Sequence, residues 1–130
     1  MSTNQLSKEI NHIDSLEFLK DNLLVEEDPY HHFSTSLAER IGLKEAIILH
    51  KLDLLLDKST TEGEGYKWIR KTYAEWKKDF PFWSEGTIKR IFQKLEKKGY
   101  IITTTDYNEI LFDNTKWYRI DYDKVGEEFL

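Results

Sequence analysis

The side chains best suited to chemistry are basic and amide groups that share one face of a predicted helix. On a helix that advances about 100° per residue, Arg90, Gln93 and Lys97 point the same way, flanked by Lys89 and Lys94. Arginine can form two hydrogen bonds with guanine, glutamine can do the same with adenine, and lysine suits phosphate. We therefore expect a surface that binds double-stranded DNA, with Arg90 and Gln93 on base edges and the three lysines on the backbone.

Five more residues complete the expected DNA-binding surface. Ser84 and Thr87, near the start of the same helix, are placed to donate to a phosphate or a base edge. Lys77 and Lys78 on the preceding helix, and Lys71 just before it, are expected on the DNA backbone. The alternative interpretation is an ordinary solvated helix, whose basic face only keeps the protein soluble.

Two capped helices are expected to position these side chains. Thr72 and Glu75 have the spacing of a capping box, which predicts a helix over residues 72–79. Ser84 is a suitable N-cap for the second helix, and Gly99 is a suitable stop. The apolar face of the second helix, which we expect to be buried, consists of Ile88, Ile91, Phe92 and Leu95.

The order of the elements predicts the fold class. A tight apolar turn, residues 80–83, joins the two helices, and two β-rich runs follow at 100–105 and 116–121. Helix, tight turn, helix and β-hairpin is the order of a winged helix-turn-helix, whose second helix enters the major groove. We therefore expect a mainly α protein with a small β-hairpin (α+β).

The segment before these helices is expected to supply the rest of the core. Ser36 and Glu39 have the spacing of a capping box, which predicts a short helix that stops at Gly42. Residues 43–58 are apolar nearly all round, as is typical of a central buried helix. Two further segments are a predicted flexible loop and a predicted short strand: residues 60–65 and 66–70.

An extra amphipathic helix is predicted near the N-terminus. Apolar residues recur at spacings of three and four over residues 6–24, and such a stripe must be buried on the domain or on a second copy. We expect it to form the contact of a homodimer. The expected organisation is an N-terminal tail and amphipathic helix at 1–32, the winged-helix domain at 33–122 and a C-terminal tail at 123–130.

Charge is unevenly distributed along the chain. The formal net charge is −5, but residues 66–98 hold 10 Lys/Arg and 4 Asp/Glu, a net +6, which leaves −11 for the remainder. Because exposed charges are screened beyond about 8–10 Å, the local basic segment decides attraction to phosphate. The loop at 106–115 has no Lys or Arg and is acidic. It favours a second hypothesis, an interaction module that binds or inhibits a host replication, transcription or nucleic-acid-binding protein.

Several classes of function are not supported by the sequence. The 130 residues contain no cysteine, which excludes disulfides and thiolate metal sites, and the four histidines lack metal-ligand spacing. We find no catalytic motif, so we expect neither an enzyme nor a cofactor. The most apolar stretch, 46–56, is too short to span a bilayer, and the N-terminus lacks the pattern of a signal peptide. The expected compartment is the cytoplasm, without a membrane partner.

Three segments resemble a known family. They are 42–50 (GLKEAIILH), 76–100 (WKKDFPFWSEGTIKRIFQKLEKKGY) and 113–122 (DNTKWYRIDY). Together they are similar to the N-terminal winged-helix domain of phage and plasmid replication proteins related to the DnaD-type replisome organisers. The resemblance covers roughly residues 33–122.

The resemblance implies a DNA-binding domain of a bacterium or its mobile elements. Such domains act at replication initiation and often self-associate, and Lys89, Arg90 and Gln93 would lie on the recognition helix. Larger family members add a domain after the wing, whereas this chain ends at Leu130. The expectation therefore covers DNA binding in replication initiation or in transcription regulation, and leaves helicase or loader recruitment open.

Overall fold

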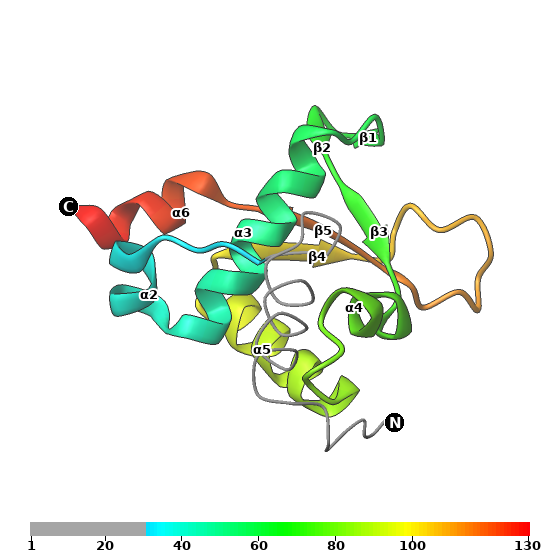
Figure 1. Ribbon diagram of the computed structural model, residues 1–130. Helices are drawn as coiled ribbons and strands as arrows, with labels where there is room; N and C mark the ends of the chain where they lie inside the picture. The colour runs from blue at the N-terminus through cyan, green and yellow to red at the C-terminus, as the bar shows by residue number, and fades with distance from the viewer. Residues whose placement is uncertain (1–30) are drawn as a thin grey trace, which may run out of the picture. The chain divides into compact units, whose positions relative to one another are not determined.

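The computed structural model describes residues 31–130 (Figure 1). The helices are α2 (Thr35–Ile41), α3 (Leu43–Asp57), α4 (Tyr73–Asp79), α5 (Glu85–Lys97), α6 (Tyr122–Gly126) and the 3-10 helix η1 (Glu127–Phe129). The strands are β1 (Glu62–Gly63), β2 (Tyr66–Lys67), β3 (Ile69–Lys71), β4 (Ile101–Thr104) and β5 (Lys116–Ile120). Helices predominate over small antiparallel sheets, which confirms the α+β class. The amphipathic helix predicted at 6–24 lies outside the described residues.

Two small antiparallel sheets are present in the described part of the chain. Strands β3, β5 and β4 form one, with β5 in the centre, so that Ile69 pairs with Tyr118 on one side and Ile101 pairs with Ile120 on the other. Strands β1 and β2 form a separate hairpin. The pairing of β3 with β5 places residues 69–71, just before α4, beside residues 116–118, which are far away in the sequence.

The β1–β2 hairpin corrects two predictions. Residues 60–65 were expected to be a flexible loop, but Glu64 and Gly65 both have positive φ (54° and 84°), the conformation of a two-residue hairpin turn. The single strand expected at 66–70 is broken at Trp68. Its buried indole donates to the carbonyl of Gly63 at 3.0 Å, and its backbone N–H donates to Thr61. These bonds hold Trp68 to the hairpin instead of to the neighbouring sheet.

The predicted start of the first described helix is also wrong. Ser34, not Ser36, is the N-cap of α2: it is extended, and its hydroxyl accepts from the backbone N–H of Leu37 at 3.2 Å. Ser36 already lies inside the helix, where its carbonyl accepts from Arg40. The predicted stop at Gly42 is confirmed, with φ of 109° and its N–H bonded to the Ala38 carbonyl.

The core lies between α3, α4, α5 and one face of the three-stranded sheet. The predicted apolar face of α5 is buried at all four positions, and Trp76 of α4 packs beside it together with Phe80, the residue that follows α4. Ring centroids of Trp76 and Phe92 are 5.0 Å apart, a contact that fixes α4 against α5. Helix α3 is less enclosed than expected, because Leu43 and Leu54 remain about half exposed.

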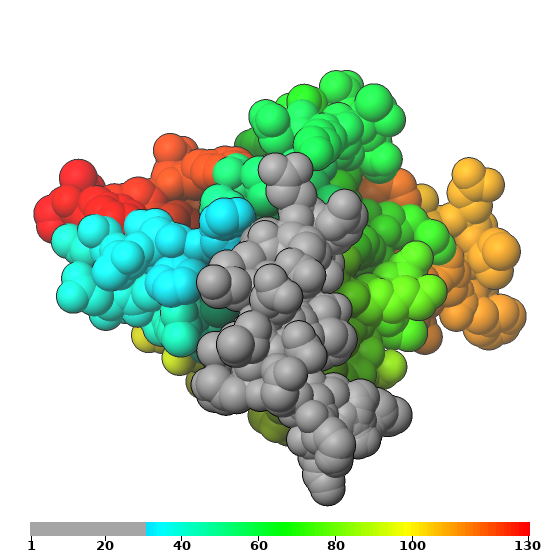
Figure 2. Space-filling view, viewed as in Figure 1, coloured from blue at the N-terminus to red at the C-terminus, as the bar shows by residue number. Residues whose placement is uncertain are grey.

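Residues 123–130, expected to be a tail, belong to the folded unit. Asp121 caps α6, and α6 and η1 lie beside α2 (Figures 1 and 2). Arg40 of α2 donates to the Glu128 carbonyl at 2.7 Å and lies over the Phe129 ring. Burial, reinforced by the Glu128 carboxylate, raises the pKa of the Tyr100 hydroxyl to about 12.

Within residues 31–130, none of the helices combines the length and the apolar character needed to cross a bilayer.

Candidate nucleic-acid interface

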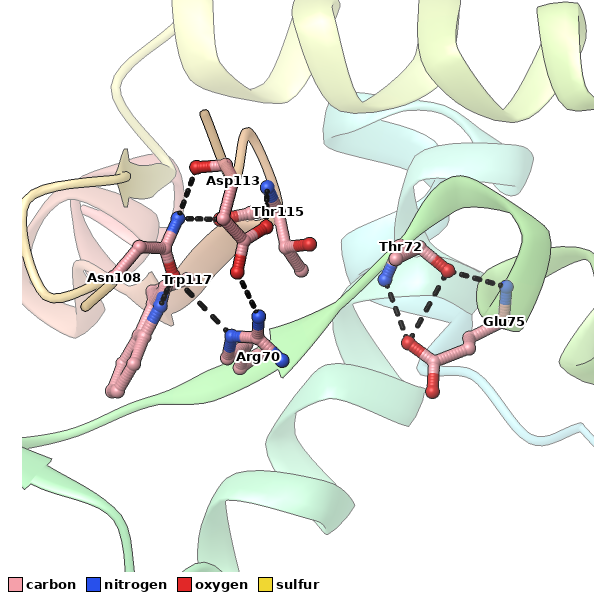
Figure 3. A network of polar contacts seen from close by, with 7 residues as sticks. All are labelled: Arg70, Thr72, Glu75, Asn108, Asp113, Thr115 and Trp117. Atoms are coloured by element: carbon pink, nitrogen blue, oxygen red, sulfur yellow. Dashed lines mark hydrogen bonds and ion pairs between the residues drawn. The ribbon is translucent and has the colours of Figure 1, made fainter. Parts of the chain in front are cut away.

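The start of α4 is fixed by the predicted capping box (Figure 3). The Thr72 hydroxyl accepts from the Glu75 backbone at 3.1 Å, and the Glu75 carboxylate accepts from the Thr72 backbone at 2.9 Å. The Thr72 backbone bond to the carboxylate lowers the pKa of Glu75. Because both bonds satisfy otherwise unpaired helix-end groups, α4 begins where the sequence predicted.

The turn between α4 and α5 is tied down by a residue that was expected on DNA. The ammonium group of Lys77 donates to the carbonyls of Pro81 (2.8 Å) and Trp83 (2.7 Å). The Phe80 side chain fills the core beneath the turn, and the His31 ring lies 4.7 Å from it. Lys77 therefore holds the angle between the helices, and contact with a phosphate would require it to leave both carbonyls.

Lys71 also has an intramolecular role. Its ammonium group pairs with the Asp79 carboxylate at the end of α4 and lies 4.6 Å from the centre of the Trp76 ring. Only 21% of its side chain is exposed. Of the three lysines that were predicted on or just before α4 to contact the DNA backbone, Lys71, Lys77 and Lys78, only Lys78 is exposed.

The first turns of α5 carry a row of polar groups. The Ser84 hydroxyl caps the helix by accepting from the Thr87 backbone at 3.1 Å, as predicted, and also lies 3.1 Å from the Thr87 hydroxyl. Arg90 donates to the same Thr87 hydroxyl at 3.1 Å. This hydrogen bond to a neutral hydroxyl holds the charged, exposed guanidinium along the helix and leaves its other N–H groups available as donors.

The outward face of α5 has the orientation that the periodicity predicted. Arg90, Gln93 and Lys97 are all exposed, and so is Lys89 beside them. The two carboxylates of the helix, Glu85 and Glu96, lie outside this arc, and Glu96 instead accepts from the Thr103 hydroxyl at 2.7 Å. Solvent exposure is thus confirmed, whereas contact with DNA stays a prediction.

Lys94 differs from its neighbours on α5. Its ammonium group lies 3.2 Å from a carboxylate oxygen of Glu45, a residue in the first turn of α3 whose side chain is only 11% exposed. The pair links the two helices at the edge of the outward face. Lys94 therefore has a structural partner in addition to any ligand.

Two residues beside this face, Lys116 and Gly86, were not among the residues predicted from the sequence. Lys116 of β5 donates to the Tyr73 hydroxyl at 3.3 Å, and its ammonium group lies 5.8 Å from the Tyr73 ring centre, while that of Lys89 lies 6.0 Å away. The ring of Tyr73 thus brings two lysines from distant segments together.

Gly86 is exposed in the first turn of α5 and leaves the backbone open there. A glycine inside a predicted helix was the available signal.

The loop after β4 is organised by polar contacts at its base (Figure 3). Arg70 of β3 pairs with Asp113, and the Asn108 amide donates to the carbonyls of Asp113 and Thr115, both at 2.8 Å. The Trp117 indole donates to the Asn108 side chain at 2.7 Å. Hydrogen bonds from Thr115, together with Arg70, lower the pKa of Asp113. The Asn108 side chain is thus bonded at the base of the loop.

The described residues contain no group of three or more metal-ligating side chains. Comparison with known proteins does not place the chain in a family: it matches no family model, and no curated protein or solved structure is significantly similar to it.

Proposed function

We propose that this domain is a winged helix-turn-helix that binds double-stranded DNA through α5. The order α3, β3, α4, α5, β4, β5 supports this, together with a three-stranded sheet in which β5 lies between β3 and β4. Residues 80–84 connect α4 to α5, and in this proposal the loop between β4 and β5 is the wing.

One observation carries the proposal: an exposed face of α5 that is free of carboxylates and bears Arg90, Gln93 and Lys97. In the major groove, Arg90 forks onto guanine O6 and N7, and Gln93 pairs with adenine N6 and N7. Lys97 neutralises a phosphate. Gly86 lets the backbone at the start of the helix come close to the DNA.

Phosphate contacts on both sides of α5 would set the orientation of the domain. Lys89 and Lys116, which share the Tyr73 ring, form one side, and Lys78 of α4 extends the basic surface. Lys71 and Lys77 are not among the proposed DNA contacts. The Asp79 carboxylate binds the first, and the turn carbonyls of Pro81 and Trp83 bind the second. The role of these two lysines is to hold α4 and the turn in the arrangement that presents α5.

The biological role that we propose follows the resemblance to DnaD-type proteins. It is replication initiation or transcription regulation in a bacterium, phage or plasmid, in the cytoplasm and as a homodimer. The proposed dimer contact at residues 6–24 lies outside the described residues.

A protein-interaction module on the same scaffold is the second candidate. It is favoured by the loop at 105–115, which is acidic and lacks Lys and Arg. An acidic wing is unsuited to a phosphate backbone, so this loop and α5 would serve different partners.

Selection of bound duplexes from a random pool, at low and at moderate salt, tests DNA binding. We expect an enriched sequence whose recognition is relaxed at one base position by Arg90→Ala, by roughly 1–3 kcal/mol. A Lys78→Ala variant should weaken all sequences alike. No enrichment at either salt concentration, or enrichment unchanged by Arg90→Ala, would overturn the proposal.

A further inference from the structure

Three consecutive large apolar residues are exposed at the tip of the loop between β4 and β5. Ile110, Leu111 and Phe112 have 67%, 88% and 87% of their surfaces exposed. Single exposed apolar residues are common on proteins, but a contiguous run of three is unusual unless it serves an interaction. The loop projects from the body of the described domain, so these side chains are accessible (orange in Figures 1 and 2).

The base of this loop is held in one shape by contacts on both sides of the tip. The backbone N–H of Asn108 donates to the Thr105 carbonyl at 3.1 Å, which forms a turn before the tip. The backbone N–H of Asp113 donates to the Ile110 carbonyl at 3.0 Å, which closes a turn around Leu111 and Phe112 themselves. The Arg70–Asp113 pair connects the loop to β3, and the Trp117 indole, which donates to the Asn108 side chain, connects it to β5. An apolar tip on an ordered base loses less conformational entropy on binding than a free segment would.

The charges around the tip indicate which kind of partner it can bind. Asp106 and Glu109 are exposed beside the apolar residues, and residues 105–115 hold no Lys or Arg. Duplex DNA and anionic lipid would be repelled by these carboxylates. A second copy of the chain does not offer a matching surface either. It is net acidic outside residues 66–98, and its basic segment carries the face proposed for DNA. A matching surface is therefore an apolar pocket bordered by Lys or Arg on a different protein.

We propose that the tip of this loop, Ile110-Leu111-Phe112 with Asp106 and Glu109, is a docking site for a partner protein that has an apolar pocket with a basic border. Phe112 and Leu111 enter the pocket, and the carboxylates pair with the border. Aromatic anchors buried at the centre of an interface commonly dominate its binding energy. The surface is separate from α5, so the proposal does not depend on DNA binding.

The test begins with a photo-crosslinking amino acid, benzoyl-phenylalanine, placed at position 111 of the full chain in its native cells. The same group at position 54, an exposed leucine of α3, is the matched control. We expect one protein adduct from position 111 that position 54 does not give. Crosslinking alone does not establish the site, so the captured protein is then purified and its affinity for each variant is measured.

Wild-type chain should bind the purified partner at least roughly tenfold more tightly than the Leu111→Ser/Phe112→Ser variant, whereas Leu54→Ser stays within roughly twofold. Asp106→Asn/Glu109→Gln should weaken binding and flatten its salt dependence. The apolar tip is exposed, so its variant should keep the wild-type unfolding temperature.

Several outcomes would overturn the proposal: no adduct at position 111, an adduct only with a second copy of the chain, or unchanged partner affinity of the tip variant. Binding of purified chain to phosphatidylcholine vesicles or to a short random duplex that the tip variant abolishes would assign the tip to lipid or DNA instead. The two proposals fail separately, because Arg90→Ala/Lys97→Ala should leave partner binding intact and the tip variant should leave DNA binding intact.

Discussion

Lys94 and Glu45 form an ion pair that joins α5 to the first turn of α3, with 3.2 Å between the ammonium nitrogen and a carboxylate oxygen. The lysine is half exposed, and the glutamate is largely buried. A side chain that helical periodicity assigns to the DNA-facing surface thus also serves the packing of two core helices. The unfolding free energy of each lysine variant on α5 must therefore be measured before a change in its DNA affinity is interpreted.

Replacement of Lys94 by alanine should lower stability more than replacement of Lys97. Loss of the ion pair leaves the Glu45 carboxylate without its cation, and because Lys94 is half exposed we expect only about 0.5–1 kcal/mol. Lys97→Ala should stay within about 0.5 kcal/mol of wild type. Chemical denaturation of both variants checks this. Equal effects would show that the pair contributes nothing measurable.

Replacement of Gly86 by alanine should stabilise the fold and weaken DNA binding. A Cβ at this position meets only ordinary contacts, 3.5 Å from the Arg90 guanidinium, so the better helix former should add up to about 1 kcal/mol. The added methyl group would hold the DNA away from the start of α5. Gly126→Ala, on α6 with open space around it, is the matched control and should leave affinity unchanged. An unchanged affinity for Gly86→Ala would remove this glycine from the interface.

Gly42 should tolerate alanine less well than Gly65. Both have positive φ, 109° and 84°, so alanine is strained at either position by about 1–2 kcal/mol. A Cβ on Gly42 would also overlap the Glu45 carboxylate, whereas nothing lies near that of Gly65. Thermal unfolding should therefore show the larger loss for Gly42→Ala. The opposite order would mean that Glu45 moves away freely.

The contribution of Asp113 to stability should disappear in acid. Hydrogen bonds from Thr115, with Arg70 beside them, lower its pKa in the folded state below the ordinary 3.8. The unfolded chain then binds the proton more tightly, so the stabilisation is complete above 3.8 and is lost as the pH falls through the folded-state pKa. The difference in unfolding free energy between wild type and Asp113→Asn should shrink across that range. A difference independent of pH would contradict this account of the loop.

Local signals in the sequence predicted the parts of this site that depend on near neighbours. Thr72 with Glu75, and Ser84, cap the two helices as expected because their partners lie three residues away. The exposed face of α5 likewise follows from helical periodicity.

Contacts between distant segments were beyond sequence patterns. Lys71 and Lys77 looked like free cations, yet Asp79 and the turn carbonyls engage them once the helices are folded. Lys116 joins Lys89 only because β5 returns beside α4. The start of α2 was misplaced by two residues because Ser34 and Ser36 are chemically equivalent N-caps. The backbone conformation decides between them: it is extended at Ser34 and helical from Thr35 onward.

The most direct test of DNA recognition by α5 compares two variants that each remove two exposed positive charges. Arg90→Ala/Lys97→Ala changes the proposed DNA face, and Lys58→Ala/Lys67→Ala changes the end of the molecule near the β1–β2 hairpin, away from α5 (Figure 1). Affinity for the selected duplex is measured over a series of salt concentrations. The first variant should lose at least roughly tenfold in affinity and about one unit of salt slope, while the second stays close to wild type. Equal affinities for the two variants would contradict recognition through α5.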